Sequence, residues 1–143
     1  GIKKDIEYFY PATFSPWKRQ SKIAYLGPQL LCVGTVQPDG FEELEACKAK
    51  KVQLEIVYFP AEKIRDYYRR AKMVWIPAIH GSERTVLEAM SCGIFPTVVV
   101  ENKKALSYVN ECIYQGLKSD PRQFILNNYS HEIFGEKLLK GIE

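Results

Sequence analysis

The clearest indication of the fold lies in residues 73–93, "MVWIPAIHGSERTVLEAMSCG". An apolar run typical of a buried strand is followed by a glycine and a serine, and then by apolar residues at helical spacing. A strand that leads through a short loop into a helix is the repeating unit of parallel α/β sheets. One carboxylate, Glu88, lies within the mostly apolar helical run. Because a buried charge is costly, Glu88 is either a solvated side chain or one that faces a ligand.

The same alternation extends through the rest of the chain. Short segments rich in Val, Ile and aromatic residues predict strands over 5–12, 29–36, 52–59, 73–79 and 96–101. Between and after them, helical spacing and end signals predict helices over 15–27, 40–51, 61–72, 82–92 and 103–111. A further strand over 112–116 and helical structure from residue 121 to the end complete the pattern. We therefore expect an α/β protein with a Rossmann-like, doubly wound parallel sheet of five or six strands, in which 5–12, 29–36 and 73–79 are central.

Composition narrows the class of protein. With 143 residues, 46% hydrophobic and 26% charged, the chain fits one globular domain over residues 1–143. A net charge of +3 is too small and too scattered to indicate a nucleic-acid surface. The 4 cysteines are widely spaced without a CxxC pair, which favours reduced thiols over disulfides or a metal site. The sequence shows no membrane span or signal peptide, so we expect a cytoplasmic protein. The basic segment 67–72 leaves peripheral contact with the inner face of a membrane open.

Two strand–helix junctions carry chemistry, because ligands of such sheets bind where strands end and helices begin. At the first, Ser15 and Pro16 predict a helix start, with Lys18 in its first turn, where a bound anion would offset the unfavourable position of a cation. Solvated cations are the alternative. The second junction offers Gly81 for close backbone approach, and two hydroxyls and a guanidinium, those of Ser82, Thr85 and Arg84, beside it. Phosphate-binding motifs of the GxGxxG and GxxxxGK[ST] types are missing from the sequence.

Residues 80–100, "HGSERTVLEAMSCGIFPTVVV", resemble the signature of the GT-B glycosyltransferases of the group 1 (GT4) type. In that family a glutamate is followed after seven residues by a second glutamate, an "AMACG" element and "PVV". Further segments are similar to the family's first strand and phosphate loop (10–20), its second strand (30–35) and the stretch before the signature (57–78). The resemblance implies one half of a GT-B architecture, the C-terminal half, which binds the nucleotide-sugar donor.

The resemblance also implies roles for individual residues. Glu88 matches the glutamate that binds the ribose hydroxyls, and His80 stands at the place of the glutamate that contacts the donor sugar. The residues that match the family's diphosphate site are Thr13, where the family has an arginine, and Lys18, Gly81, Ser82 and Thr85. The base is expected near the end of the third strand, by Val57, against Tyr58 and Phe59. Ala12 replaces a glycine, and Phe95 is an insertion before Pro96.

The resemblance implies a hexosyltransferase that uses a UDP-, GDP- or ADP-sugar, with no cofactor, no metal and no nucleic acid. Its acceptor would lie on an N-terminal domain or a partner subunit, and no catalytic residue is identified within this chain. Two other functions stay open. A non-catalytic nucleotide-sugar-binding or assembly module fits the changes at Thr13 and His80. A sugar-nucleotide epimerase has the same two-domain architecture.

Overall fold

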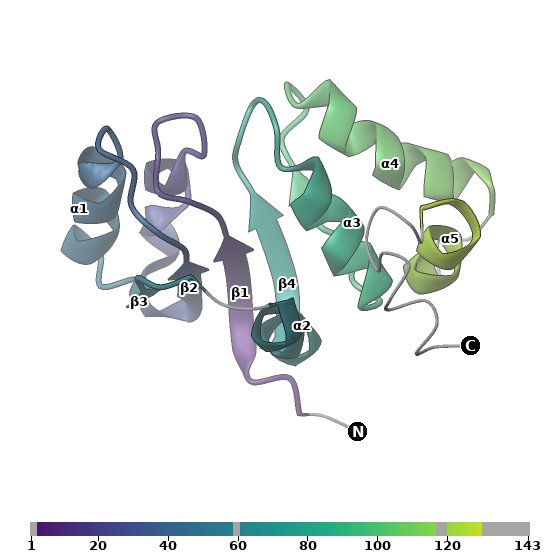
Figure 1. Ribbon diagram of the computed structural model, residues 1–143, viewed down its shortest axis with the longest axis horizontal. Helices are drawn as coiled ribbons and strands as arrows, with labels where there is room; N and C mark the ends of the chain where they lie inside the picture. The colour runs from purple at the N-terminus through teal and green to yellow at the C-terminus, as the bar shows by residue number, and fades with distance from the viewer. Residues whose placement is uncertain (1–2, 59–60, 117–119, 130–143) are drawn as a thin grey trace.

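A computed structural model describes residues 3–58, 61–116 and 120–129 of the chain. Within these ranges a sheet of five parallel strands runs through the molecule (Figure 1). The strands are β1 (Ile6–Pro11), β2 (Leu30–Val33), β3 (Gln53–Glu55), β4 (Ala71–Ile76) and β5 (Thr97–Val98). Their order in the sheet is β3-β2-β1-β4-β5, so the three strands expected at the centre are central. The predicted α/β fold with a parallel sheet is confirmed.

The central strands form because their side chains are removed from water on both sides. All four residues of β2 are buried, and Phe9 of β1 lies beside Leu31 on one side and Val74 on the other. Continuous apolar strands of this kind are typical of parallel sheets with both faces covered. Burial of apolar side chains is the main favourable term in folding, and the central strands thereby fix the position of the loops that follow them.

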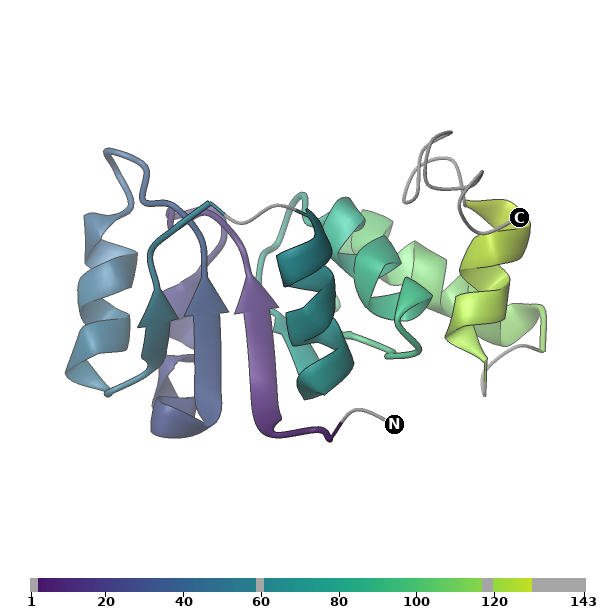
Figure 2. The same ribbon diagram turned by 60° about the horizontal axis from the view of Figure 1, so that its bottom comes forward.

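In the described part of the chain, five α-helices pack around the sheet: α1 (Phe41–Ala49), α2 (Ala61–Arg70), α3 (Glu83–Ser91), α4 (Lys103–Tyr114) and α5 (Pro121–Asn128). The chain passes from β1 outward to β2 and β3, and then returns to β4 and β5 on the other side of β1. Because crossovers between parallel strands are right-handed, this reversal places the connecting segments on opposite faces of the sheet. Figures 1 and 2 show α1 beside β3 and β2, while α3, α4 and α5 gather at the opposite end of the molecule.

The prediction of a helix over 15–27 is wrong. The chain makes a turn after Ser15 and then two 3-10 segments, η1 (Gln20–Lys22) and η2 (Ala24–Gln29). Arg19 interrupts a helix because its backbone is left-handed, with φ of 56°, and its guanidinium Nη1 donates to the carbonyl of Pro77 at 3.2 Å. Gly27, with φ of 61°, breaks the second segment. The first junction therefore has no α-helical dipole, and its positive charge comes from the side chains of Lys18 and Arg19.

The strand predicted over 112–116 is also wrong, because α4 continues to Tyr114. Ala105, Val109 and Cys112 are buried on one side of this helix at spacings of four and three residues. The burial of these side chains keeps residues 112–114 helical, although their local sequence favours a strand. The other predicted strands and helices exist with shifted ends, and β5 is reduced to two residues. Of the helical structure predicted after Pro121, α5 is present, and residues 130–143 lie outside the described part of the chain.

Further findings concern the thiols and the membrane. The 4 cysteines are free, and Cys32, Cys47 and Cys112 are buried. No helix within the described residues has the length and apolar character needed to cross a bilayer.

Candidate functional site

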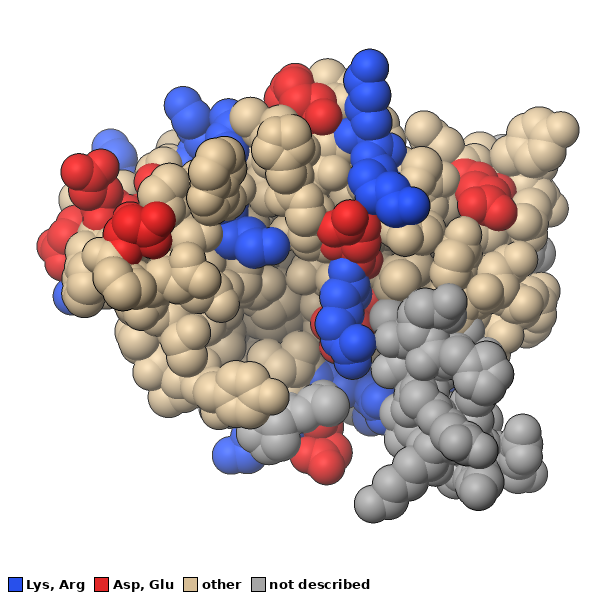
Figure 3. All heavy atoms as spheres, turned by 45° about the horizontal axis from the view of Figure 1, so that its top comes forward, with Lys and Arg blue, Asp and Glu red and all other residues tan. Residues whose placement is uncertain are grey.

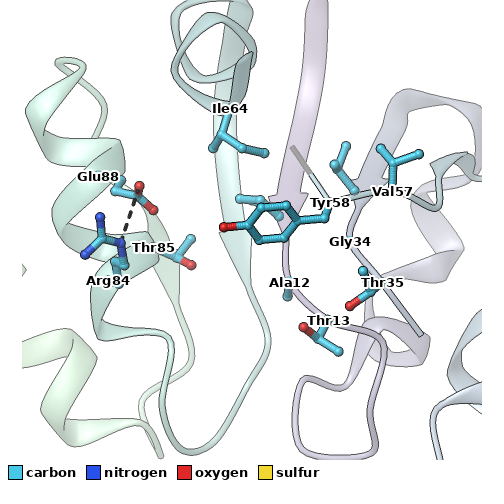
Figure 4. A pocket seen from close by; sticks show the side chains of 12 residues that line it. Ala12, Thr13, Gly34, Thr35, Val57, Tyr58, Ile64, Arg84, Thr85 and Glu88 are labelled. Carbon is cyan, nitrogen blue, oxygen red and sulfur yellow. Dashed lines mark ion pairs between the residues drawn. The ribbon is translucent and has the colours of Figure 1, made fainter. Parts of the chain in front are cut away.

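A cleft of about 260 Å³ opens at the carboxyl edge of the sheet, next to β1, the strand at which the strand order reverses. Small molecules bind to doubly wound sheets in this position. The cleft is lined by residues that follow β1, β2 and β3 and by residues of α2 and α3, which include Thr13, Thr35, Tyr58, Ile64, Arg84, Thr85 and Glu88. Figure 4 shows the polar side chains of α3 on one side of the cleft and Thr13 and Thr35 on the other.

Gly34 allows the ends of β1 and β2 to form the floor of this cleft. A Cβ atom at position 34 would lie 2.1 Å from the carbonyl oxygen of Ala12, a distance that no side chain tolerates. The amide of Gly34 donates to the carbonyl of Glu55, and the amide of Ala12 donates to the carbonyl of Val33. The sequence reasoning did not single out Gly34, although a glycine directly after a buried strand is a signal of close backbone approach.

Glu88 faces the cleft from the second turn of α3, and its side chain is 25% exposed. Its carboxylate oxygen Oε2 lies 3.7 Å from the Arg84 guanidinium, one turn earlier in the helix. Burial raises the pKa of the Glu88 carboxyl, while the charge of Arg84 acts in the opposite direction. Figure 3 views the carboxyl edge from above and shows a hollow bordered on one side by basic and acidic side chains. Glu88 is therefore a partly desolvated carboxylate that a ligand can reach, and not a solvated surface residue.

The Tyr68 hydroxyl contacts the carboxylate of Glu88. This tyrosine of α2 is buried, its hydroxyl lies 3.5 Å from Oε1 of Glu88, and its ring meets Phe9 of β1 edge-on. Burial, and then the nearby Glu88 charge, raise the pKa of the Tyr68 hydroxyl well above its usual range. Tyr68 therefore remains a neutral donor toward Glu88. No motif in the sequence links these two residues, because only the packing of α2 against α3 brings them together.

The predicted diphosphate residues lie in two adjoining groups. Thr13 and Thr85 line the cleft itself. Lys18 lies beside it, where its ammonium donates to the Ser82 hydroxyl at 3.1 Å and approaches Gly81. This contact joins the two junctions, which are 64 residues apart in the chain. Burial lowers the pKa of Lys18, as expected for a cation that is partly removed from water.

Side chains that donate to backbone carbonyls hold both loops of this contact in place. The Tyr10 hydroxyl donates to the carbonyl of Lys18 at 2.7 Å. On the other loop, the buried Asn102 amide donates to the carbonyls of Ala78 and Gly81 at 2.9 and 3.0 Å. Ser82 precedes α3 with a left-handed backbone, at φ of 65°. The sequence reasoning missed Tyr10 and Asn102 as supports, and an asparagine directly before the predicted helix was the available signal for the latter.

The end of the cleft near β3 is formed by Val57 and Tyr58. Tyr58 is 87% exposed, which excludes a role in the core. Its ring projects toward α3 across the cleft in Figure 4. Phe59, the other residue expected at the base, lies outside the described part of the chain.

His80 does not line this cleft. It lies with Ile79 in a second pocket, together with Pro16, Trp17, Arg19, Ser21, Lys22 and Glu43. This pocket adjoins the Lys18–Ser82 contact along the chain, because Trp17 and Arg19 flank Lys18 and His80 is followed by Gly81 and Ser82. The predicted site is thus divided into a cleft around Glu88, a lysine–serine contact and a pocket around His80.

The sheet order and the position of the cleft define a Rossmann-like α/β domain whose binding edge is formed by the loops after β1, β2, β3 and β4. The fold is similar to that of the catalytic domain of cholesterol-alpha-glucosyltransferase from Helicobacter pylori. The two share 14% sequence identity with a TM-score of 0.58, over 95% of this chain and 96% of that one. At this identity the likeness concerns the fold. No protein-family model matches the chain, and no curated protein matches it by sequence.

Proposed function

We propose that the chain is the donor-binding domain of a glycosyltransferase and that it holds the nucleoside diphosphate part of a nucleotide sugar in the Glu88 cleft. The observation that carries this proposal is the position of Glu88. Its partly buried carboxylate faces a cleft at the carboxyl edge of the sheet, while Lys18 and Ser82 meet beside that cleft. An ionised carboxylate acts only as a hydrogen-bond acceptor, and its two oxygens can accept from the two neighbouring hydroxyls of a ribose.

With the ribose at Glu88, the positions of the base and the diphosphate can be proposed as well. The base would lie on Tyr58, whose exposed ring offers a stacking surface that is tolerant of base identity. The diphosphate would lie toward Thr13, Thr85 and the ammonium of Lys18. A UDP-, GDP- or ADP-sugar satisfies these contacts equally well, because none of these side chains reads the edge of a base.

Glycosyl transfer would take place when an acceptor meets the donor at this edge. The departing diphosphate gains negative charge as the bond to the sugar breaks, and a cation already in position stabilises it. Lys18 would serve this purpose, since hydrogen bonds from Tyr10 and to Ser82 hold its loop and its ammonium. The acceptor would be held by a second domain or a partner subunit that covers the carboxyl edge. The chain provides the donor half of such a site.

Isothermal titration with UDP, GDP and ADP tests the binding step. One of the three is expected to bind to the chain, and the matching nucleoside monophosphate more weakly, because it lacks the second phosphate near Lys18. Failure of all three to bind would refute the proposal. Hydrolysis of the matching nucleotide sugar by the chain, alone and with a separately supplied acceptor domain, then tests transfer.

A non-catalytic nucleotide-sugar-binding module is the second candidate. It is favoured by Thr13, which brings a neutral hydroxyl to the cleft in place of the arginine that GT-B enzymes of the resembled type carry. Without a cation at position 13, the site would still bind a diphosphate but would stabilise the leaving group less. Nucleotide-sugar binding without hydrolysis or transfer, also in the presence of an acceptor domain, would support the module and exclude the enzyme.

A further inference from the structure

The proposed nucleotide contacts give no role to the pocket around His80. Its volume is about 360 Å³, within the range of small-molecule sites. Trp17 is 67% exposed at this pocket, and Pro16 and Ile79 contribute further apolar surface. An exposed tryptophan beside a pocket is costly in water and is a frequent feature of a binding surface.

The loop that carries Trp17 is held in place although the ring is exposed. Arg19 donates to the carbonyl of Pro77 on the β4 loop. Ser21 is bound through its backbone amide and its hydroxyl to the two carboxylate oxygens of Glu43, at 2.9 and 3.1 Å. Contacts from β1, from the β4 loop and from α1 therefore fix the loop before any ligand binds, which lowers the entropic cost of binding.

The charges around this pocket are mainly basic. Arg19, Lys22 and His80 provide cationic or hydrogen-bond-donating groups. Glu43 is the only acid among the lining residues, and both of its oxygens accept hydrogen bonds from Ser21. A neutral hexose is recognised largely through its hydroxyl groups, for which a free carboxylate is an effective acceptor. The pocket instead offers an apolar ring surface and donors, which suit a ring that carries a negative group.

Resting on the proposed function, we propose that this pocket holds the sugar of the bound nucleotide sugar and selects a sugar that carries a carboxylate, such as a hexuronic acid. The apolar face of the ring packs on Trp17, and the carboxylate lies among Arg19, Lys22 and His80. The connection along the chain supports the placement, because Lys18 and Ser82, which adjoin the diphosphate, are sequence neighbours of the residues that line this pocket.

The test compares three ligands by isothermal titration. They are the nucleoside diphosphate that the chain binds, its neutral hexose conjugate and its hexuronic acid conjugate. The hexuronic acid conjugate is expected to bind about tenfold more tightly than the hexose conjugate, through one charge-assisted hydrogen bond or more. Equal affinity of the two sugar conjugates would overturn this inference and leave the proposed function intact. Failure of every nucleoside diphosphate to bind would overturn both.

Two variants separate the pocket from the nucleotide cleft. His80→Glu exchanges a donor for a carboxylate and is expected to abolish the preference for the hexuronic acid conjugate, without changing the affinity for the nucleoside diphosphate. Trp17→Ala is expected to weaken both sugar conjugates to a similar extent. Tyr25→Ala is the matched control, because Tyr25 is as exposed as Trp17, at 68%, but does not line the pocket. If Trp17→Ala behaves like Tyr25→Ala, the sugar does not lie on Trp17 and the inference is wrong.

Discussion

Glu88→Gln is the substitution that best tests how the cleft recognises a nucleotide. The side chain keeps its shape, but one of its two acceptor oxygens becomes an amide that can only donate. Two ribose hydroxyls can then no longer both be accepted. Loss of a hydrogen bond to a charged group costs about 1.5–3 kcal/mol, which is roughly a ten- to hundredfold loss of affinity. The 25% exposure of Glu88 places the contact in a partly desolvated site, where such a bond is not replaced by water without cost.

The assay measures nucleoside diphosphate affinity and the free energy of unfolding for the wild type and for Glu88→Gln. Stability is expected to stay the same or to rise slightly, because the variant removes a carboxylate whose pKa burial has raised. Glu42→Gln, at an exposed position of α1, is the control and should change neither quantity. Two results would refute the reasoning. Unchanged affinity in Glu88→Gln would remove the ribose role, and a marked loss of stability would mean that Glu88 is a structural residue.

Three further predictions follow from the same geometry. Lys18→Ala should weaken nucleoside diphosphate binding by about 1–2 kcal/mol and leave the bare nucleoside nearly unaffected, so an equal loss for both ligands in titration would exclude a phosphate contact. Nucleotide affinity should fall as the pH drops through the pKa of Glu88, which burial raises above its ordinary value of 4.5. Over the same pH range the Glu88 contribution to folding stability should increase, because the folded state binds this proton more tightly than the unfolded state. Neither pH-dependent change should appear in Glu88→Gln. Gly34→Ala should destabilise the fold by about 3 kcal/mol, since its Cβ would lie 2.1 Å from the Ala12 carbonyl. Gly93→Ala, with nothing within 4 Å, should cost only about 1 kcal/mol for its positive φ. Similar urea midpoints for the two variants would contradict this reasoning.

Part of the architecture could be predicted from local patterns. The apolar runs of β2, Leu30–Val33, and of the second half of β4, residues 74–76, contain no charge and indicate strands that are covered on both faces. Their alternation with helical segments led to the parallel sheet and to its three central strands. The same reasoning failed over 15–27, where Ser15 and Pro16 have the features of a helix start. There the contact of Arg19 with Pro77, a residue distant in the chain, favours a left-handed backbone that ends any helix.

In the candidate site, too, local patterns predicted some features, and contacts between distant residues decided the others. Residue type and spacing placed Glu88, Ser82 and Lys18 at strand–helix junctions, where ligands of such sheets bind, but left open that these side chains are simply solvated. The resemblance to the GT-B signature is what singled them out as candidates. Spacing could not reveal that Lys18 meets Ser82, nor that His80 belongs to a different pocket from Glu88.

The sequence by itself determined the alternation of strands and helices, since periodicity and end signals depend on neighbours within a few residues. It also indicated which side chains are candidates for binding a ligand. The tertiary structure alone decided which of these side chains meet. Gly34 lets two strand ends approach, Tyr68 reaches Glu88 from another helix, and the Lys18–Ser82 contact spans 64 residues. Contacts of this kind depend on how the packed core brings distant loops to one edge, and no local pattern in the chain encodes that arrangement.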